Sequence, residues 1–470
     1  MMFDTFQYWI FFAAVLLGLA LLRDRPAKVA LVLASFVFYG VWDWRFCLLL
    51  GGSIVVNYFF GIAIDAREGN ARKRMVALAV AFNLAVLGFF KYANFFVDSF
   101  ATLFGLNPDG MLLNIVLPVG ISFFTFEGIA YAVDIYRRQM RAVRDPVDFS
   151  LFITFFPHLV AGPIIRPMDF FPQLAQRLPL TSEDSRWGMR EILKGLIKKV
   201  AFANWFAPIA DAWYTGAQYQ GAQVPAWAGV LAFSMQIYFD FSGYTDIARG
   251  CARLLGYKFP PNFERPYLSA SITEFWRRWH ISLSFWLRDY LYISLGGNRV
   301  SVPRTYVNLL IVMGLGGLWH GASWNFAIWG LYHGFLLIGH RLWRQAVEKS
   351  GLAGIVDARW LLPFWVALSF VIVTLGWIPF RAPDFAASLA TFQALLAPQD
   401  WGFAQAHPAI VLIPVGTLAF CLLDHRRWLQ DWLVQRANLP LVALVGALAL
   451  LFLEIFAQVD AQVPFVYFQF

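Results

Sequence analysis

The chain has 470 residues, of which 59% are hydrophobic, 18% aromatic and only 14% charged. Soluble domains carry about 25% charged residues, so this composition excludes an ordinary soluble protein and indicates a membrane protein. The net formal charge of +8 does not indicate nucleic-acid binding, because the basic residues lie in short loops between apolar runs, the pattern that orients membrane proteins.

The N-terminal part of the chain contains five predicted membrane spans, since a span needs about 20 mostly apolar residues. Its first span lacks a basic n-region and a small-residue cleavage site, so we expect it to be retained and not removed as a signal peptide. The loops between alternate spans are basic, which predicts that these loops are cytoplasmic and that the N-terminus lies outside. The spans cover residues 6–22, 29–41, 46–64, 75–92 and 112–136, and the basic loops cover residues 23–28, 65–74 and 137–145.

Residues 149–168 are apolar but are interrupted by three prolines and a glycine. Non-helical backbone at membrane depth is tolerated only where it is buried in protein or lines a cavity. We therefore expect a re-entrant or interfacial segment, and a loop on the membrane surface is an equally good interpretation. Residues 183–199 then predict an amphipathic cytoplasmic helix, and residues 200–214 and 225–247 predict two further spans.

Residues 271–293 are too charged for a span that faces lipid, so they predict a helix that lies in the interface or lines a cavity. On one continuous helix, Glu274 and Arg278 are neighbours four residues apart. The same helix would place His280 and Arg288 in one polar band.

The C-terminal part predicts further spans separated by two basic stretches, and the count places the C-terminal tail outside the membrane. We expect an all-α polytopic membrane protein with about eleven transmembrane helices plus re-entrant or interfacial helices, in a single domain of residues 1–470. The predicted spans are residues 306–318, 324–340, 360–380, 410–422 and 439–456, with basic stretches at residues 341–349 and 426–436.

Histidines provide the candidate chemistry, because a histidine within a membrane span is costly unless it faces the bundle interior or a wet cavity. A neutral imidazole can act as a general base near pH 7, and His280, His320 and His333 are the candidates. His158, in the proline-broken segment, fits a capping or core role better. The glycines around His320 fit either close approach of an acceptor or tight helix packing.

No pattern of a metal or nucleotide site accompanies these histidines. The chain contains no HExxH or CxxC pattern, nucleophile elbow, phosphate-binding loop or dinucleotide fingerprint. We expect no metal and no bound cofactor. The cysteines lie far apart without ligand spacing and are assigned to packing; they are Cys47, Cys251 and Cys421.

Five separated motifs together resemble the membrane-bound O-acyltransferase family. The closest resemblance within that family is to the bacterial branch of alginate O-acetyltransferases, and the D-alanyl transferase of teichoic acids is also similar. The motifs are WHGASWNFAIWGLYHG, EFWRRWHISLSFWLRDYLYISLGGNR, YFDFSGYTDIARG, FFPHLVAGPIIRP and the terminal PFVYFQF.

The resemblance implies a helical bundle pierced by a tunnel, located in a bacterial inner membrane. By motif, His320 matches the catalytic histidine at the membrane midplane, and His280 matches a second functional histidine on the cytoplasmic side. The implied donor is acetyl-CoA, and the implied acceptor is a hydroxyl of an envelope or secreted polysaccharide. A periplasmic acetyltransferase of the SGNH or alginate-modifying kind is the implied partner.

Two further hypotheses concern the ends of such a tunnel. Arg277, Arg278 and Arg288 could contact the phosphates of the donor, or they could extend their charged ends to the interface. The extracytoplasmic tail could present the Tyr467 hydroxyl to His320 as an acyl relay, or it could anchor the chain in the aromatic belt.

Two other functions compete with a polysaccharide O-acetyltransferase. An acyltransferase of the same fold could act on a teichoic acid, a lipid or a protein. A transporter or flippase would need charges along a pathway and usually internal repeats. The sequence shows no repeat, and its few acidic candidates lie near span ends, so the transporter is the weaker alternative.

Overall fold

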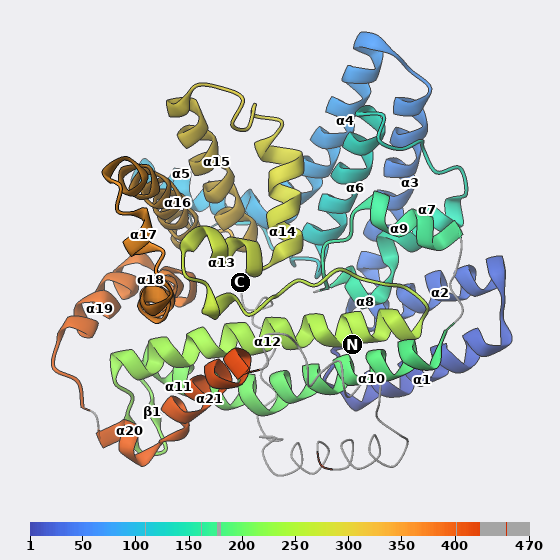
Figure 1. The fold of residues 1–470 in the computed structure, drawn as a ribbon. Helices are drawn as coiled ribbons and strands as arrows, with labels where there is room; N and C mark the ends of the chain where they lie inside the picture. Colours follow the sequence, from blue (N-terminus) through green and yellow to red (C-terminus); the bar gives the residue numbers. More distant parts are fainter. Residues whose placement is uncertain (109, 161, 176–179, 401, 424–447, 449–470) are drawn as a thin grey trace. The chain divides into compact units, whose positions relative to one another are not determined.

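The computed structural model describes residues 1–108, 110–160, 162–175, 180–400, 402–423 and 448. These residues are predominantly helical, and the strands among them form one short antiparallel hairpin of β1 (Gln218–Tyr219) and β2 (Ala222–Gln223) (Figure 1). They divide into two compact units. The first contains residues 1–192 and 244–260, and the second contains residues 193–243 and the described residues from 261 onward.

The first unit is built mainly from the N-terminal helices. It also contains most of α10 (Ser182–Leu196) and the C-terminal end of α12 (Ala226–Leu254). Its other elements are α1 (Phe6–Leu21), α2 (Asp24–Asp43), α3 (Arg45–Asp65), α4 (Gly69–Leu87), η1 (Gly88–Tyr92), α5 (Ala93–Leu103), α6 (Ile121–Tyr136), α7 (Pro146–Thr154), α8 (Phe156–Leu159) and α9 (Pro167–Ala175).

The second unit contains the remaining helices and most of α12. Its elements before residue 300 are η2 (Ile197–Ala203), α11 (Asn204–Thr215), η3 (Pro266–Leu268), α13 (Ile272–Arg278), α14 (Ile281–Trp286) and η4 (Leu287–Tyr292). Those after residue 300 are α15 (Val302–His320), α16 (Trp324–Ser350), α17 (Ala353–Val356), η5 (Arg359–Leu361), α18 (Leu362–Arg381), α19 (Phe385–Leu396), α20 (Gly402–Ala406) and α21 (Ala409–Leu423).

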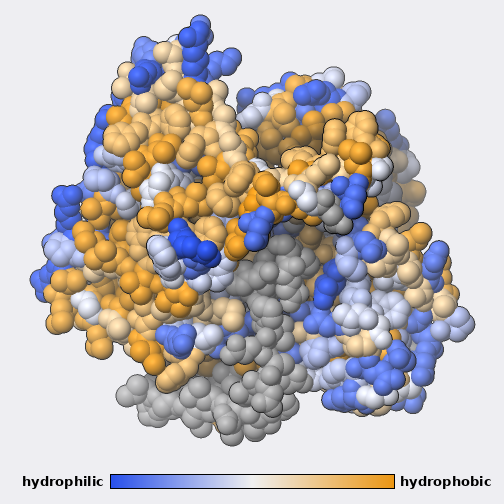
Figure 2. All heavy atoms as spheres, turned by 180° about the vertical axis from the view of Figure 1, so that it is seen from behind, coloured by the Kyte–Doolittle hydropathy of each residue, from blue (hydrophilic) through white to orange (hydrophobic). Residues whose placement is uncertain are grey.

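Four helical segments among the described residues are long and apolar enough to cross a membrane: α2, α3, the continuous helix of residues 69–103, and residues 359–381. α1 and α19 are shorter apolar helices. Apolar side chains cover broad areas of the face shown in Figure 2. Among the described residues, Phe6, Leu17 and Leu48 are strongly exposed. Such a surface fits lipid as the surrounding solvent. The chain is a multi-pass membrane protein, whereas the expected count of about eleven spans is not confirmed.

The span expected over residues 112–136 is wrong in its first third, because the helix α6 begins only at Ile121. Pro118 disfavours helical backbone in the residue before it, and Gly120 has a left-handed φ of 77°. A Cβ at Gly120 would lie 2.5 Å from the Leu159 carbonyl oxygen. Most of α6 is buried, so this helix packs within the protein and does not face lipid.

The proline-broken segment of residues 149–168 folds into the short helices α7 and α8, an irregular stretch and the start of α9. Nearly all of its described side chains are buried. The interpretation as a loop on the membrane surface is therefore wrong. The irregular backbone is buried in protein, as the cost of unsatisfied peptide groups requires.

Three of the expected basic loops are largely helical. Residues 24–28 form the start of α2, residues 69–74 form the start of α4, and residues 341–349 belong to the last turns of α16. Long basic side chains extend from a helix end as readily as from a loop, so charge marks the end of an apolar run and not the end of the helix.

The amphipathic helix expected at residues 183–199 is present as α10, which continues into η2. Within the first unit its charged side chains bind the end of α12: Arg253 pairs with Asp184 at 2.6 Å, and Arg249 pairs with Glu191 at 3.0 Å. Both guanidinium groups also lie 5.1 Å from the centroid of the Trp187 ring, a favourable cation–π distance.

Candidate active site

His280 lies at a sharp break in the chain. α13 ends at Arg278, Trp279 is extended, and α14 begins at Ile281. His280 has a φ of 44°, a left-handed conformation that costs a non-glycine residue about 1 kcal/mol or more. The continuous helix expected over residues 271–293 is therefore wrong, and with it the shared polar band.

Asn262 holds His280 in this strained conformation. The Asn262 side-chain oxygen Oδ1 lies 3.2 Å from His280 Nδ1. The same oxygen accepts hydrogen bonds from the Ser282 amide at 3.1 Å and from the Ser282 hydroxyl at 2.9 Å. The backbone carbonyl of Asn262 accepts the Ile281 amide at 3.0 Å. All these groups lie in the second unit.

This arrangement determines which nitrogen of His280 carries the proton. A backbone amide is always a donor, so the Asn262 atom that binds the Ser282 amide must be the oxygen. Because that oxygen can only accept, His280 Nδ1 must carry the hydrogen in the neutral ring. Nε2 is then left with its lone pair, which makes it a proton acceptor.

His320 is the last residue of α15 and is only 4% exposed. Its ring centroid lies 5.1 Å from that of Trp329, with an interplanar angle of 89°, and 5.2 Å from that of Phe380, with an angle of 67°. The centroid of the His280 ring lies 6.4 Å from that of His320. The second unit therefore brings the two predicted histidines together in a buried aromatic environment.

The glycines around His320 serve helix packing. α15 packs along α16 more extensively than any other pair of described elements. A Cβ at Gly317 would lie 2.1 Å from the Phe326 carbonyl oxygen, and a Cβ at Gly330 would lie 2.1 Å from the Met313 carbonyl oxygen. Of the two interpretations of these glycines, the structure supports close approach of two backbones.

His333, the third candidate, is fully buried on α16. The centroid of its ring lies 5.1 Å from that of Trp276 and 4.9 Å from that of Trp329. Neither ring nitrogen makes a hydrogen bond to a described residue. His333 therefore shares Trp329 with His320, and its described contacts are those of an aromatic packing residue.

The three predicted donor-binding arginines lie on two different elements. Arg278 pairs with Glu274 at 2.5 Å, which confirms the expected neighbours, and Arg277 is exposed beside it on α13. Arg288 lies on η4 and pairs with Asp289 at 2.7 Å. The role of these arginines in donor binding stays a prediction.

Two other predicted residues lie apart from this group. Tyr467 lies outside the described residues. His158 belongs to the first unit, where its Nδ1 lies 3.0 Å from Glu127 Oε1 and both side chains are fully buried. This pair gives His158 the core partner that its sequence context favoured.

Sequence reasoning missed Asn262, which determines the tautomer of His280. Asn262 precedes His280 by 18 residues, and no local periodicity connects an irregular segment to a helix start at that distance. The preceding Pro260 and Pro261 predict a rigid loop but do not indicate its neighbour. In the described part of the chain, no group of three or more metal-ligating side chains lies close enough to hold a metal ion.

Comparison with known proteins identifies the family of the chain. The family model of the membrane-bound O-acyltransferases matches residues 136–378, a range that includes both His280 and His320.

Curated relatives support the same assignment over a larger part of the chain. The chain is 42% identical over 430 residues to a probable alginate O-acetylase, AlgI, of Pseudomonas aeruginosa, covering 90% of this chain and 80% of the relative. It is 37% identical over 396 residues to a peptidoglycan O-acetyltransferase of Helicobacter pylori, covering 78% and 73%. It is 29% identical over 307 residues to a teichoic acid D-alanyltransferase of Streptococcus thermophilus, covering 58% and 70%. The chain therefore belongs to the membrane-bound O-acyltransferase family and is an acyltransferase.

Proposed function

We propose that this acyltransferase moves an acetyl group from cytoplasmic acetyl-CoA across a bacterial inner membrane to a hydroxyl of an envelope or exported, alginate-like polysaccharide. The observation that carries the proposal is the pair of buried histidines, with ring centroids 6.4 Å apart, in a chain 42% identical to a probable alginate O-acetylase.

In the proposed reaction His320 is the general base. It removes the proton from the acceptor hydroxyl as that oxygen attacks the thioester carbonyl carbon. The carbon–sulfur bond then breaks, and the proton passes to the sulfur, so that CoA leaves as its thiol. A positioned base of this kind contributes about 10² to 10⁴ in rate.

His280 is proposed to carry the proton on the donor side. With its Nδ1 hydrogen held by Asn262, its Nε2 can accept a proton and return it to the departing sulfur. The same property makes His280 the second candidate for the base itself. Its tautomer is determined by the hydrogen bonds around it, and rotation of the ring is restricted by them.

The nature of the donor supports the tunnel that the family resemblance implies and a donor-binding role for basic side chains. A CoA thioester is highly charged and cannot cross lipid, so we expect only its acetyl group to move through the protein. Arg277, Arg278 and Arg288 are the candidates for contact with the donor phosphates. Arg277 is exposed, whereas the other two are already paired with carboxylates.

On the acceptor side, the acetyl group can reach the polysaccharide by two routes. The Tyr467 hydroxyl could take the acetyl group first and pass it on, or His320 could serve the polysaccharide directly. A periplasmic acetyltransferase of the SGNH or alginate-modifying kind is the proposed partner for final transfer. Tyr467→Phe keeps the aromatic ring and removes the nucleophile, so full polymer acetylation in this variant would exclude the relay.

Polymer acetylation in cells tests the proposal. His320→Ala and His280→Ala should lose acetylation at membrane levels equal to wild type, whereas His407→Ala, a histidine outside the site, should keep it. Ester-linked acetate is measured separately in exported polysaccharide and in peptidoglycan. Loss only in the peptidoglycan fraction would replace the proposed acceptor with that of the Helicobacter relative. Unchanged acetylation in both fractions of His320→Ala would reject the proposed base.

A further inference from the structure

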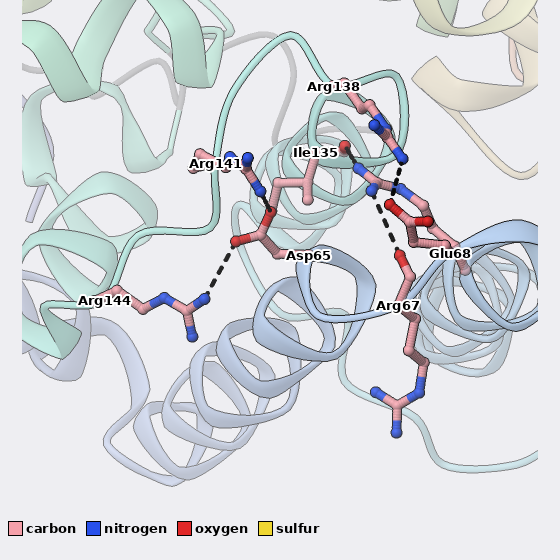
Figure 3. Close-up of polar contacts among 8 residues, drawn as sticks. Asp65, Arg67, Glu68, Ile135, Arg138, Arg141 and Arg144 are labelled. Atoms are coloured by element: carbon pink, nitrogen blue, oxygen red, sulfur yellow. Dashed lines mark hydrogen bonds and ion pairs between the residues drawn. The ribbon is translucent and has the colours of Figure 1, made fainter.

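Two basic loops of the first unit meet at one end of the membrane span α3. Arg141 and Arg144 both bind the carboxylate of Asp65, at 3.4 Å and 3.2 Å, and Arg138 binds Glu68 at 2.9 Å (Figure 3). We call Arg138, Arg141 and Arg144 the arginine cluster. The Asp65 side chain is only 7% exposed beneath two arginines that are 88% and 63% exposed. Asp65 therefore orients these guanidinium groups without covering them.

The loop that carries the arginine cluster is held in place by its backbone. The Tyr58 hydroxyl donates to the Arg144 carbonyl at 2.7 Å, and the Val143 amide donates to the Tyr131 hydroxyl at 3.0 Å. The buried Arg72 guanidinium donates to the carbonyl of Ile135, just before this loop. A loop fixed in this way presents its charged side chains in a preorganised arrangement.

Arg138 occupies a strained position. Its φ is 60°, in the left-handed region that glycine occupies at the end of many helices without steric cost. An arginine in this conformation lowers the folding stability, whereas a glycine would not. Strain of this kind persists mainly where the side chain has a function.

The charge of the two loops exceeds what their own acids neutralise. Residues 65–74 and 137–145 contain eight basic and three acidic side chains, a net formal charge of +5. A guanidinium has five N–H donors, and the hydrogen bonds of Arg141 and Arg144 to Asp65 each use one of them. Exposed ion pairs of this sort contribute little to folding stability, so stability does not account for the cluster.

The surface beside the cluster is apolar. Asp65 is the last residue of α3, which is long and apolar enough to span a membrane. Val55 and Phe59, four residues apart on α3, are 54% and 62% exposed. Phe59 lies six residues before Asp65, about 9 Å along a helix. A molecule with an anionic head and an acyl chain matches this order of charged and apolar side chains.

We propose that the arginine cluster binds the phosphodiester headgroup of an anionic phospholipid whose acyl chain lies along Val55 and Phe59 of α3. Arginine forks match phosphate oxygens well, and basic clusters next to membrane spans attract anionic lipid. This site is independent of the acyl-transfer chemistry proposed above.

Lipid titration of the purified full-length protein in detergent tests the site. The unfolding midpoint is followed as phosphatidylglycerol or phosphatidylcholine of the same acyl chains is added, and native mass spectrometry counts retained lipid. Arg141→Gln/Arg144→Gln should need about thirtyfold more phosphatidylglycerol for half the shift, since each basic side chain near an anionic headgroup strengthens binding about fivefold. The control Lys349→Gln/Arg359→Gln removes two exposed charges of the second unit and should behave as wild type.

Further variants separate binding from folding. Adding Asp65→Asn to the double variant removes the carboxylate that would be left unpaired, and the loss of lipid response should persist. Arg138→Gly should weaken the response about fivefold while the lipid-free unfolding midpoint stays equal or rises. Equal effects of the two lipids, or equal losses in cluster and control variants, would overturn the proposal. An equal shift with glycerol phosphate at the same concentration would overturn it too, because a free anion would then suffice.

Discussion

Replacing Asn262 tests whether its oxygen sets the tautomer of His280, on which the proposed proton transfer depends. Asn262→Leu keeps a similar volume and removes the acceptor for His280 Nδ1 and for both donors of Ser282. Asn262→Asp keeps an oxygen in the same place. The Asn262 Nδ2 group makes no hydrogen bond to a described residue, so its loss in the aspartate variant removes no described contact.

The expected magnitudes follow from the hydrogen bonds. Loss of one buried hydrogen bond of about 1.4 kcal/mol lowers the rate about tenfold. If the imidazole ring is then free to turn away, the rate falls by a further factor of up to about a hundred. We expect Asn262→Leu to lower the transfer rate about 10- to 10³-fold, and Asn262→Asp to stay within about threefold of wild type.

The assay is acetyl transfer by purified protein under saturating donor, with unfolding midpoints measured in the same detergent. Asn262→Leu should also unfold at a lower temperature, because two donors of Ser282 lose their acceptor. Each buried polar group left unsatisfied costs about 1–3 kcal/mol of folding stability. Equal inactivity of both folded variants would refute the argument, and so would wild-type activity of Asn262→Leu.

Three further predictions concern packing around and beyond the histidines. Gly317→Ala should lower the unfolding free energy by about 1–3 kcal/mol or more, because its Cβ would lie 2.1 Å from a backbone carbonyl oxygen. The control Gly339→Ala places its Cβ in open space and should be neutral or stabilising. Equal unfolding midpoints of these two variants would contradict the packing account. Glu127→Leu should destabilise by about 3–5 kcal/mol, and adding His158→Leu should restore part of that loss, because the single variant leaves one member of a buried pair behind; additive losses in a double-mutant cycle would refute the pairing. His333→Phe should keep acetyl transfer within a fewfold of wild type, because neither ring nitrogen bonds a described residue; a loss as large as that of a catalytic base would give His333 a chemical role.

The lipid-facing helices were predictable from sequence. Residues 46–64 predicted a span, and α3 runs from Arg45 to Asp65. The expected span at residues 360–380 agrees equally well with the helical residues 359–381. In both cases the surrounding solvent is lipid, so length and hydropathy alone determine the helix.

Helices buried inside the protein were less predictable, because hydropathy does not distinguish a lipid-facing side chain from a buried one. Residues 112–136 have the composition of a span, yet Pro118 and the left-handed Gly120 delay the helix to Ile121. The buried segment after α7 has the same apolar composition as a span and is broken by its prolines.

The histidines of the candidate site were predictable as residues, but their geometry was not. The proximity of His280 and His320 and the break at His280 both depend on contacts between segments far apart in the chain. Asn262 imposes that break through hydrogen bonds from a separate loop. The order of charged and apolar residues around His280 does not indicate that Asn262 is its partner.

The most direct test of the account measures acetyl transfer from labelled acetyl-CoA by purified wild-type, His320→Ala and His407→Ala proteins. Each protein is supplied with the proposed acceptor polysaccharide and with the proposed periplasmic partner, and its folding is checked by its unfolding midpoint. The account predicts that His320→Ala loses about 10² to 10⁴ in rate, while His407→Ala transfers acetyl groups as wild type does. Transfer by folded His320→Ala within a fewfold of wild type would contradict the central claim.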